Sequence, residues 1–225
     1  MKKRIVACVV AVALLGGLIF AFQVCSSPPP AVEEIYDRVV ELVESSYRFN
    51  TIFLGEGLPV YEEDSEYAAF SYLYFGTSVP GGYEVVSDYS TYFSIDAIKD
   101  DAEKIYSKSF LESVWYPMAF DGYAVDDNAG GAIALAKYHQ ANQQIYLAKS
   151  HTNYFMTQDP QTGKPVQREP RVYDYSTMKI INPSNSEACI VQMSSWLSSS
   201  PDQITEATVN LVLQDGQWYL NSYTV

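Results

Sequence analysis

Four stretches in the last third of the chain show the alternation of apolar and polar residues that is typical of β-strands. Short turn sequences separate them, among them Asp215-Gly216, a pair that favours a tight hairpin turn. Strands that follow one another through short turns pair antiparallel. The pattern therefore predicts a four-stranded antiparallel meander, with strands at 172–181, 188–197, 204–213 and 218–225.

Helical periodicity dominates the segments before these strands. A helix is predicted over 32–49, because apolar residues recur there every three or four positions. A second helix is expected from a cap at Ser94 or Asp96 to about Tyr106. A third should begin at the capping-box sequence 109–112 and end at Pro117. Helices followed by a meander predict an α+β domain, with N-terminal helices packed on one face of a curved antiparallel sheet.

The middle of the chain carries weaker signals. Residues 83–86 are expected to form a strand, whereas the aromatic-rich segment 67–75 fits either a strand or a short helix. Ile133 and Leu135 predict one strand, Ile145 and Leu147 the next, and 140–143 the hairpin turn between them. Residues 149–171 have no pattern and contain three prolines, which predicts a long loop.

The N-terminus has the features of an export or anchor segment. Lys2, Lys3 and Arg4 precede an apolar run over 5–24, which as a helix would be about 30 Å long and could span a bilayer. We expect a membrane anchor; a cleaved signal peptide and lipidation at Cys25 are the alternatives. A proline-rich spacer ends at residue 30, so 1–30 is assigned to anchor and spacer and 31–225 to an extracytoplasmic domain, anchored to the plasma membrane or secreted.

The net charge of the chain limits the kinds of partner that it can bind. The chain has a formal net charge of −13, and without the three N-terminal basic residues it keeps 11 basic against 27 acidic residues. Such a body repels phosphate backbones and anionic lipid, so we expect no nucleic acid, and membrane contact only through the N-terminus. The folded part has a single cysteine, Cys189, which is expected to be a core residue in a strand.

No catalytic or metal-binding motif is present. His139 and His151 are far from any second ligand at metal spacing and are expected to be exposed turn residues. Asp126-Asp127-Asn128 lacks the spacing of a calcium loop. No nucleophile elbow or phosphate-binding loop occurs. The sequence therefore predicts a non-catalytic protein without cofactor or metal.

Candidate contact residues come from two segments. Tyr154, Phe155 and Asp159 lie in the predicted long loop, where aromatic side chains are more available to a partner than in a strand. Glu62, Glu63 and Asp64 belong to an acidic cluster that is expected to be solvated. The tyrosines in the predicted strands are better explained by sheet packing; they are Tyr138, Tyr146, Tyr173 and Tyr175.

Several short segments together resemble a known family. They are 83–86, 105–110, 136–138, 145–147 and the ending Leu-Val-Leu-Gln-Asp-Gly-Gln-Trp-Tyr-Leu at 211–220. The set is similar to the bacterial peptidoglycan DL-endopeptidase inhibitors of Gram-positive organisms. The Asp-Gly-x-Trp-Tyr-Leu ending also resembles NTF2-like and cystatin-like sheets.

The first resemblance implies a two-lobed α+β body that blocks a cell-wall peptidase without doing chemistry. A protein partner, specifically a cell-wall hydrolase, is then expected. The alternatives are an NTF2-like pocket domain that binds a small ligand or performs acid–base chemistry, and a purely structural envelope protein.

Overall fold

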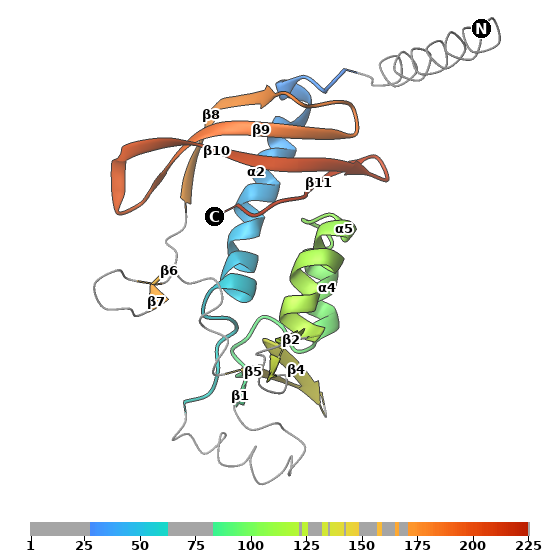
Figure 1. Ribbon diagram of the computed structural model, residues 1–225, viewed down its shortest axis with the longest axis vertical. Helices are drawn as coiled ribbons and strands as arrows, with labels where there is room; N and C mark the ends of the chain where they lie inside the picture. The colour runs from blue at the N-terminus through green and yellow to red at the C-terminus, as the bar shows by residue number, and fades with distance from the viewer. Residues whose placement is uncertain are drawn as a thin grey trace, which may run out of the picture.

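The computed structural model shows an α+β protein in which helices pack against antiparallel sheets (Figure 1). It describes residues 28–62, 83–121, 123–125, 132–134, 136–141, 143–148, 157–158, 165–166 and 171–224. No helix within these ranges is long and apolar enough to cross a membrane. The expected anchor over 5–24, Cys25 and the aromatic segment 67–75 lie outside the described residues.

The predicted meander forms the largest sheet. Its strands are β8 (Arg171–Ile181), β9 (Ala188–Leu197), β10 (Ser200–Gln214) and β11 (Gln217–Leu220), in the order β11-β10-β9-β8. Each pair is antiparallel, as predicted. Asp215 and Gly216 both have positive φ in the last turn, 50° and 79°, which a glycine adopts without steric cost. Strand β10 begins at Ser200, earlier than the expected residue 204.

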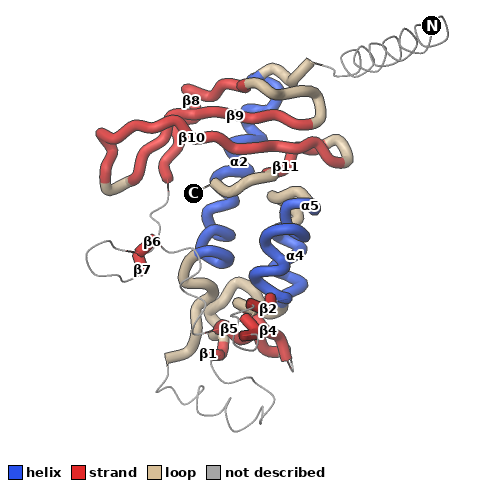
Figure 2. The backbone as a smooth tube through the Cα atoms, viewed as in Figure 1, coloured by secondary structure: helices blue, strands red, loops and turns tan. Residues whose placement is uncertain are grey.

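Helix α2 (Val32–Phe49) covers one face of this sheet, as Figures 1 and 2 show. It contacts β8 and β11. Its Val39, Leu42 and Val43 have no exposed surface. The inward residues of β9 and β10 are buried as well; they are Cys189, Val191, Met193, Val209 and Leu211. Burial of each large aliphatic side chain contributes about 1.5–3 kcal/mol, so this face carries much of the stability. Cys189 is a core residue, as expected.

Two helical predictions need correction at their ends. Helix α4 (Ile95–Ala102) begins at the Ser94 cap but ends before Tyr106. The backbone there turns to pair with the last strand: Leu220 N–H donates to Ile105 O at 2.8 Å, and Ser107 N–H donates to Leu220 O at 2.8 Å. These bonds to a distant segment replace the helical ones.

The third helical segment begins and ends elsewhere than predicted. Ser107, not Ser109, is the cap, because its hydroxyl accepts from Phe110 N–H at 3.2 Å. The segment continues through α5 (Lys108–Phe110) and the π-helical turns Leu111–Trp115 and Pro117–Asp121, so Pro117 does not end it. The buried side chains Leu111, Trp115 and Met118 hold this irregular path in place.

The Ser94 cap provides a direct test of local stability. Its hydroxyl accepts a hydrogen bond from Ala97 N–H at 3.1 Å. We expect Ser94→Ala to lower the free energy of unfolding by about 1 kcal/mol, because one N–H of the first turn loses its partner. Urea denaturation measures the change, and Ser94→Asp, which restores an acceptor, should recover most of it.

A second, smaller sheet lies at the far end of α2 (Figure 1). It has the order β1-β5-β4, from β1 (Tyr83–Val85), β5 (Gln144–Ala148) and β4 (Tyr138–Ala141). The predicted partner of 145–147 was the strand at 133–135. That strand, β3 (Ala132–Ala134), instead pairs with β2 (Tyr123–Val125). The hairpin partner is β4, so residues 140 and 141 lie in a strand and Gln143, with φ 65°, lies in the turn.

Within the predicted long loop, β6 (Thr157–Gln158) and β7 (Pro165–Val166) pair antiparallel. The rest of 149–170 lies outside the described residues.

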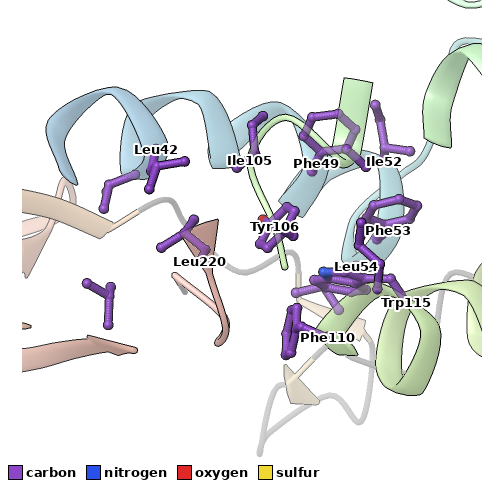
Figure 3. Close-up of a cluster of buried hydrophobic side chains, with 14 of the residues drawn as sticks. Leu42, Phe49, Ile52, Phe53, Leu54, Ile105, Tyr106, Phe110, Trp115 and Leu220 are labelled. Atoms are coloured by element: carbon purple, nitrogen blue, oxygen red, sulfur yellow. The ribbon is translucent and has the colours of Figure 1, made fainter. Parts of the chain in front are cut away.

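An aromatic core joins the two ends of the molecule (Figure 3). The π-helical turn Asn50–Leu54 continues α2 and brings Phe53 onto Trp115, with ring centroids 4.8 Å apart. Phe49 stacks on Phe53 at 5.6 Å and meets Tyr106 edge-on at 6.1 Å. The core is therefore continuous from the large sheet to the small one.

Candidate partner-binding site

The segment 87–94, here called the aromatic loop, joins β1 to α4 and exposes two large side chains. Tyr89 is 88% exposed and Phe93 is 67% exposed, the largest values among the described large hydrophobic residues. Asp88, on the same loop, is also exposed. Aromatic residues in such positions are the usual centres of protein–protein contacts. Tyr89, Phe93 and the carboxylate of Asp88 therefore form a candidate contact surface for a protein partner.

The base of the loop is anchored. Tyr92 points inward, is 5% exposed, and its hydroxyl donates to Asp101 Oδ2 at 3.0 Å. Burial, with a smaller effect from this hydrogen bond, raises the pKa of Tyr92 to about 12. Ser90 N–H donates to Ser87 O at 3.0 Å, and Tyr92 N–H donates to Ser90 Oγ at 3.1 Å. A loop held in this way loses little conformational entropy when it binds.

A small cavity lies beside the exposed Phe93. Its volume is about 80 Å³, and it is lined by Tyr61, Val86, Ser87, Asp88, Tyr92, Phe93, Gln143, Gln144 and Ile145. The 59–61 segment forms one side, because Ser87 N–H donates to Pro59 O at 2.8 Å and Tyr61 OH accepts from Asp88 N–H at 3.2 Å. The cavity is thus lined by both aromatic and polar residues.

Ser87 stands out in this cavity. It is 4% exposed, and its Oγ has no hydrogen-bond partner in the part of the chain that the structure describes. A buried hydroxyl without a partner costs roughly 1–3 kcal/mol. A hydrogen bond donated by a ligand to Ser87 Oγ would remove this cost.

The structure places only one of the sequence-predicted contact residues. Glu62 is exposed and directly follows Tyr61, so it flanks the cavity. The other five lie outside the described residues: Glu63, Asp64, Tyr154, Phe155 and Asp159. Packing explains the strand tyrosines, since Tyr138, Tyr146 and Tyr173 are at most 7% exposed and Tyr175 is half-buried.

Sequence reasoning missed Tyr89 and Phe93. The sequence contained a signal: three aromatic residues, Tyr89, Tyr92 and Phe93, lie in a short segment with serines at 87, 90 and 94, the last of which caps the following helix. Polar turn residues around an aromatic side chain indicate that it is not part of an apolar stripe. Which of the three aromatics of this loop would turn inward could not be read from that pattern.

Reactive groups elsewhere do not form a catalytic set within the described residues. His139 lies in strand β4 and is half-buried, not in an exposed turn, because the strand extends further than predicted; His151 lies outside the described residues. Burial raises the pKa of Cys189 to about 11, which keeps its thiol protonated. No group of three His, Cys, Asp or Glu residues in the described ranges could hold a metal ion.

Lys137 is a buried cation at the start of β4. It is 2% exposed, and its Nζ donates to Gly55 O at 2.7 Å. Burial lowers its pKa to about 7. The next residue, Tyr138, fixes the same loop, because its hydroxyl donates to Ile52 O at 2.9 Å and accepts from Leu58 N–H at 3.0 Å. Lys137 does not line the cavity beside the aromatic loop.

A larger cavity of about 350 Å³ lies between α2, α4 and β11. Its three cations, Arg38, Arg48 and Lys104, are engaged with the protein itself. Arg38 pairs with Glu41 at 2.9 Å and also donates to the carbonyls of Lys104 and Trp218. Asp101, beside this cavity, accepts Lys104 at 2.6 Å and Arg48 at 3.4 Å. These cations hold the helices together and are less available to a ligand than Ser87 and Asp88.

No protein-family model, curated protein or solved structure matches this chain.

Proposed function

We propose that this protein is a non-catalytic binding domain at the cell envelope, and that it restrains a cell-wall hydrolase of the peptidoglycan DL-endopeptidase type. The observation that carries the proposal is the aromatic loop, which presents Tyr89 and Phe93 to solvent from an anchored base. Two exposed aromatic side chains on one short loop support a binding role, because aromatic residues are enriched at protein–protein contacts.

The charge of the chain supports a protein partner. The net charge is −13, and the exposed residues Glu62 and Asp88 carry acidic groups beside the aromatic loop. A basic partner would be steered toward this surface, at a rate that falls with ionic strength. The basic start and apolar run at the N-terminus support an extracytoplasmic location, where cell-wall hydrolases act.

The pocket-domain alternative is less well supported. It requires a cavity between the sheet and the helix that covers it, but α2 packs directly on β8 and β11. Cys189, Val191 and Leu211, which point inward there, are at most 2% exposed. Neither of the two cavities described above has the enclosed apolar lining that such a domain uses to hold a small ligand.

The proposal is tested by inhibition. We expect the purified protein to slow peptidoglycan cleavage by a cysteine-dependent endopeptidase of the same organism, and the effect to weaken as salt rises from 50 to about 500 mM. A dye-release assay on isolated cell walls measures it. If none of the organism's wall hydrolases is slowed, the inhibitor function is wrong.

Substitutions in the aromatic loop should separate binding from folding. We expect Tyr89→Ala and Phe93→Ala each to weaken hydrolase binding at least tenfold, about 1.4 kcal/mol, because both rings would be buried in the complex. Their melting temperatures should stay near that of the wild type, since both side chains are exposed. Surface plasmon resonance measures the dissociation constant, and thermal denaturation measures the melting temperature.

Tyr36→Ala is the matched control for these substitutions. Tyr36 is an exposed tyrosine on α2, outside the loop, and is 37% exposed. Its replacement should leave binding unchanged. Equal losses from Tyr36→Ala and Tyr89→Ala would show that the loop is not the contact.

A further inference from the structure

The cavity beside the aromatic loop offers hydrogen-bond acceptors to a guest. Ser87 Oγ is buried and unpartnered among the described residues, and the Asp88 carboxylate is exposed at the rim. Gln144 uses its amide nitrogen internally, donating to Val86 O at 2.8 Å and Ile145 O at 3.1 Å. A carboxylate and an unpaired hydroxyl select a guest that donates hydrogen bonds and carries positive charge.

The walls of the cavity favour the same guest. The rings of Tyr61 and Phe93 line it, and Val86 and Ile145 contribute apolar surface. Aromatic faces attract ammonium and guanidinium groups, and apolar walls accommodate the methylene stem of a long side chain. The volume of about 80 Å³ admits the end of one side chain but not a folded segment or a nucleotide.

We propose that this cavity receives the cationic side chain of one lysine or arginine of the protein partner, between Tyr61 and Phe93 and against Ser87 Oγ and the Asp88 carboxylate. This inference rests on the proposed function, because it names the partner's contact at the same loop. The stem of the guest packs on the rings, and its N–H groups satisfy the buried hydroxyl.

The test uses small probes with the whole protein. N-acetyl-lysine methylamide and N-acetyl-arginine methylamide are titrated while methyl NMR follows Val86 and Ile145. N-acetyl-norleucine methylamide, which has a comparable apolar stem and no charge, is the matched probe. We expect saturable shifts at both methyl positions with at least one cationic probe, and none with norleucine. If neither cation shifts these methyls, or if norleucine binds equally well, the inference is wrong.

Variants locate the contact. Asp88→Asn should weaken binding of the cationic probe at least fivefold, and Ser87→Ala should weaken it by a smaller factor. Asp96→Asn, which removes an exposed carboxylate that does not line the cavity, should leave binding unchanged. Equal losses from Asp88→Asn and Asp96→Asn would show only the general attraction of an acidic surface, and would contradict the proposed insertion.

The outcomes separate this inference from the proposed function. A protein that inhibits the hydrolase but does not bind the cationic probes retains its function and loses this contact. A protein that binds the probes at the cavity but inhibits no hydrolase retains the basic-side-chain site and requires a different partner.

Discussion

A chain that ends at Ser222 is expected to lose roughly 5 kcal/mol of stability. Thr224 is 1% exposed and joins three buried groups. Its Oγ1 accepts from Asn50 Nδ2 at 2.9 Å and shares a hydrogen bond with Ser46 Oγ at 2.5 Å. Its carbonyl accepts from Tyr173 OH at 2.8 Å. Removal takes this partner from the buried Asn50 Nδ2 and Tyr173 OH, at about 1–3 kcal/mol each, whereas Ser46 Oγ keeps its hydrogen bond to Val43 O.

The truncation also removes a ring from the aromatic core. Tyr223 meets Phe110 and Trp115 edge-on, with centroids 5.4 and 5.1 Å apart. Such pairs contribute about 0.5–1.5 kcal/mol beyond buried area. Urea denaturation measures the loss as a lower midpoint. Thr224→Ser keeps the hydroxyl and should lose much less than the truncation; equal losses in both would show that the tail hydrogen bonds are not responsible.

The second large effect is a rise in stability with pH from 7 to 8.5, caused by Lys137. Burial lowers the pKa of Lys137 from 10.5 to about 7 in the folded protein. Between these values the unfolded chain binds a proton that the folded chain does not, so raising the pH favours folding. Below the folded pKa both states are protonated and this contribution has no further slope. The full difference of about 3.5 pKa units corresponds to about 5 kcal/mol, of which about 1.5 kcal/mol appears between pH 7 and 8.5.

Lys137→Met isolates this effect. The stability of the variant should not rise with pH through the titration of residue 137. At pH 7 its free energy of unfolding should match or exceed that of the wild type, because a buried cation is replaced by an apolar side chain of similar length. The loss of the hydrogen bond to Gly55 O offsets part of the gain. Urea denaturation at pH 7 and 8.5 gives the slopes.

Lys108→Met is the control for Lys137→Met. Its side chain is 74% exposed, so the wild-type slope should persist. A wild-type protein whose stability is flat over this range would contradict the burial of Lys137.

The elements that were predicted correctly are those with long, regular patterns. Helix 32–49 has five turns of periodic apolar residues and matches α2 residue for residue. Strand 188–197 matches β9 in both bounds, and buried residues alternate with less buried ones along it. In both, the apolar stripe decides the buried face, because one period fits one backbone.

Errors occurred where distant residues decide local structure. The backbone of Ile105 and Ser107 pairs with Leu220, which ends α4 early although the helical pattern continues. The strand at Ala132–Ala134 pairs with Tyr123–Val125 and not, as predicted, with 145–147. A local pattern carries no information about such partners.

In the candidate site, too, some features could be predicted from the sequence and others depend on residues distant in the chain. The acidic net charge and the exposure of Glu62 could be anticipated from composition, because solvation of carboxylates depends little on fold. The outward turn of Tyr89 and Phe93 could not, because Tyr92 of the same loop turns inward to meet Asp101, a residue of the following helix.

The sequence alone determined the meander, the helix that covers it and the acidic surface, since each follows from periodicity or charge along a continuous stretch. Tertiary structure alone decided the buried state of Lys137, the anchoring of Thr224 and the cavity at Ser87. Each of these depends on groups contributed by segments remote in sequence, and the energy of a buried polar atom is set by the neighbours that the fold brings to it.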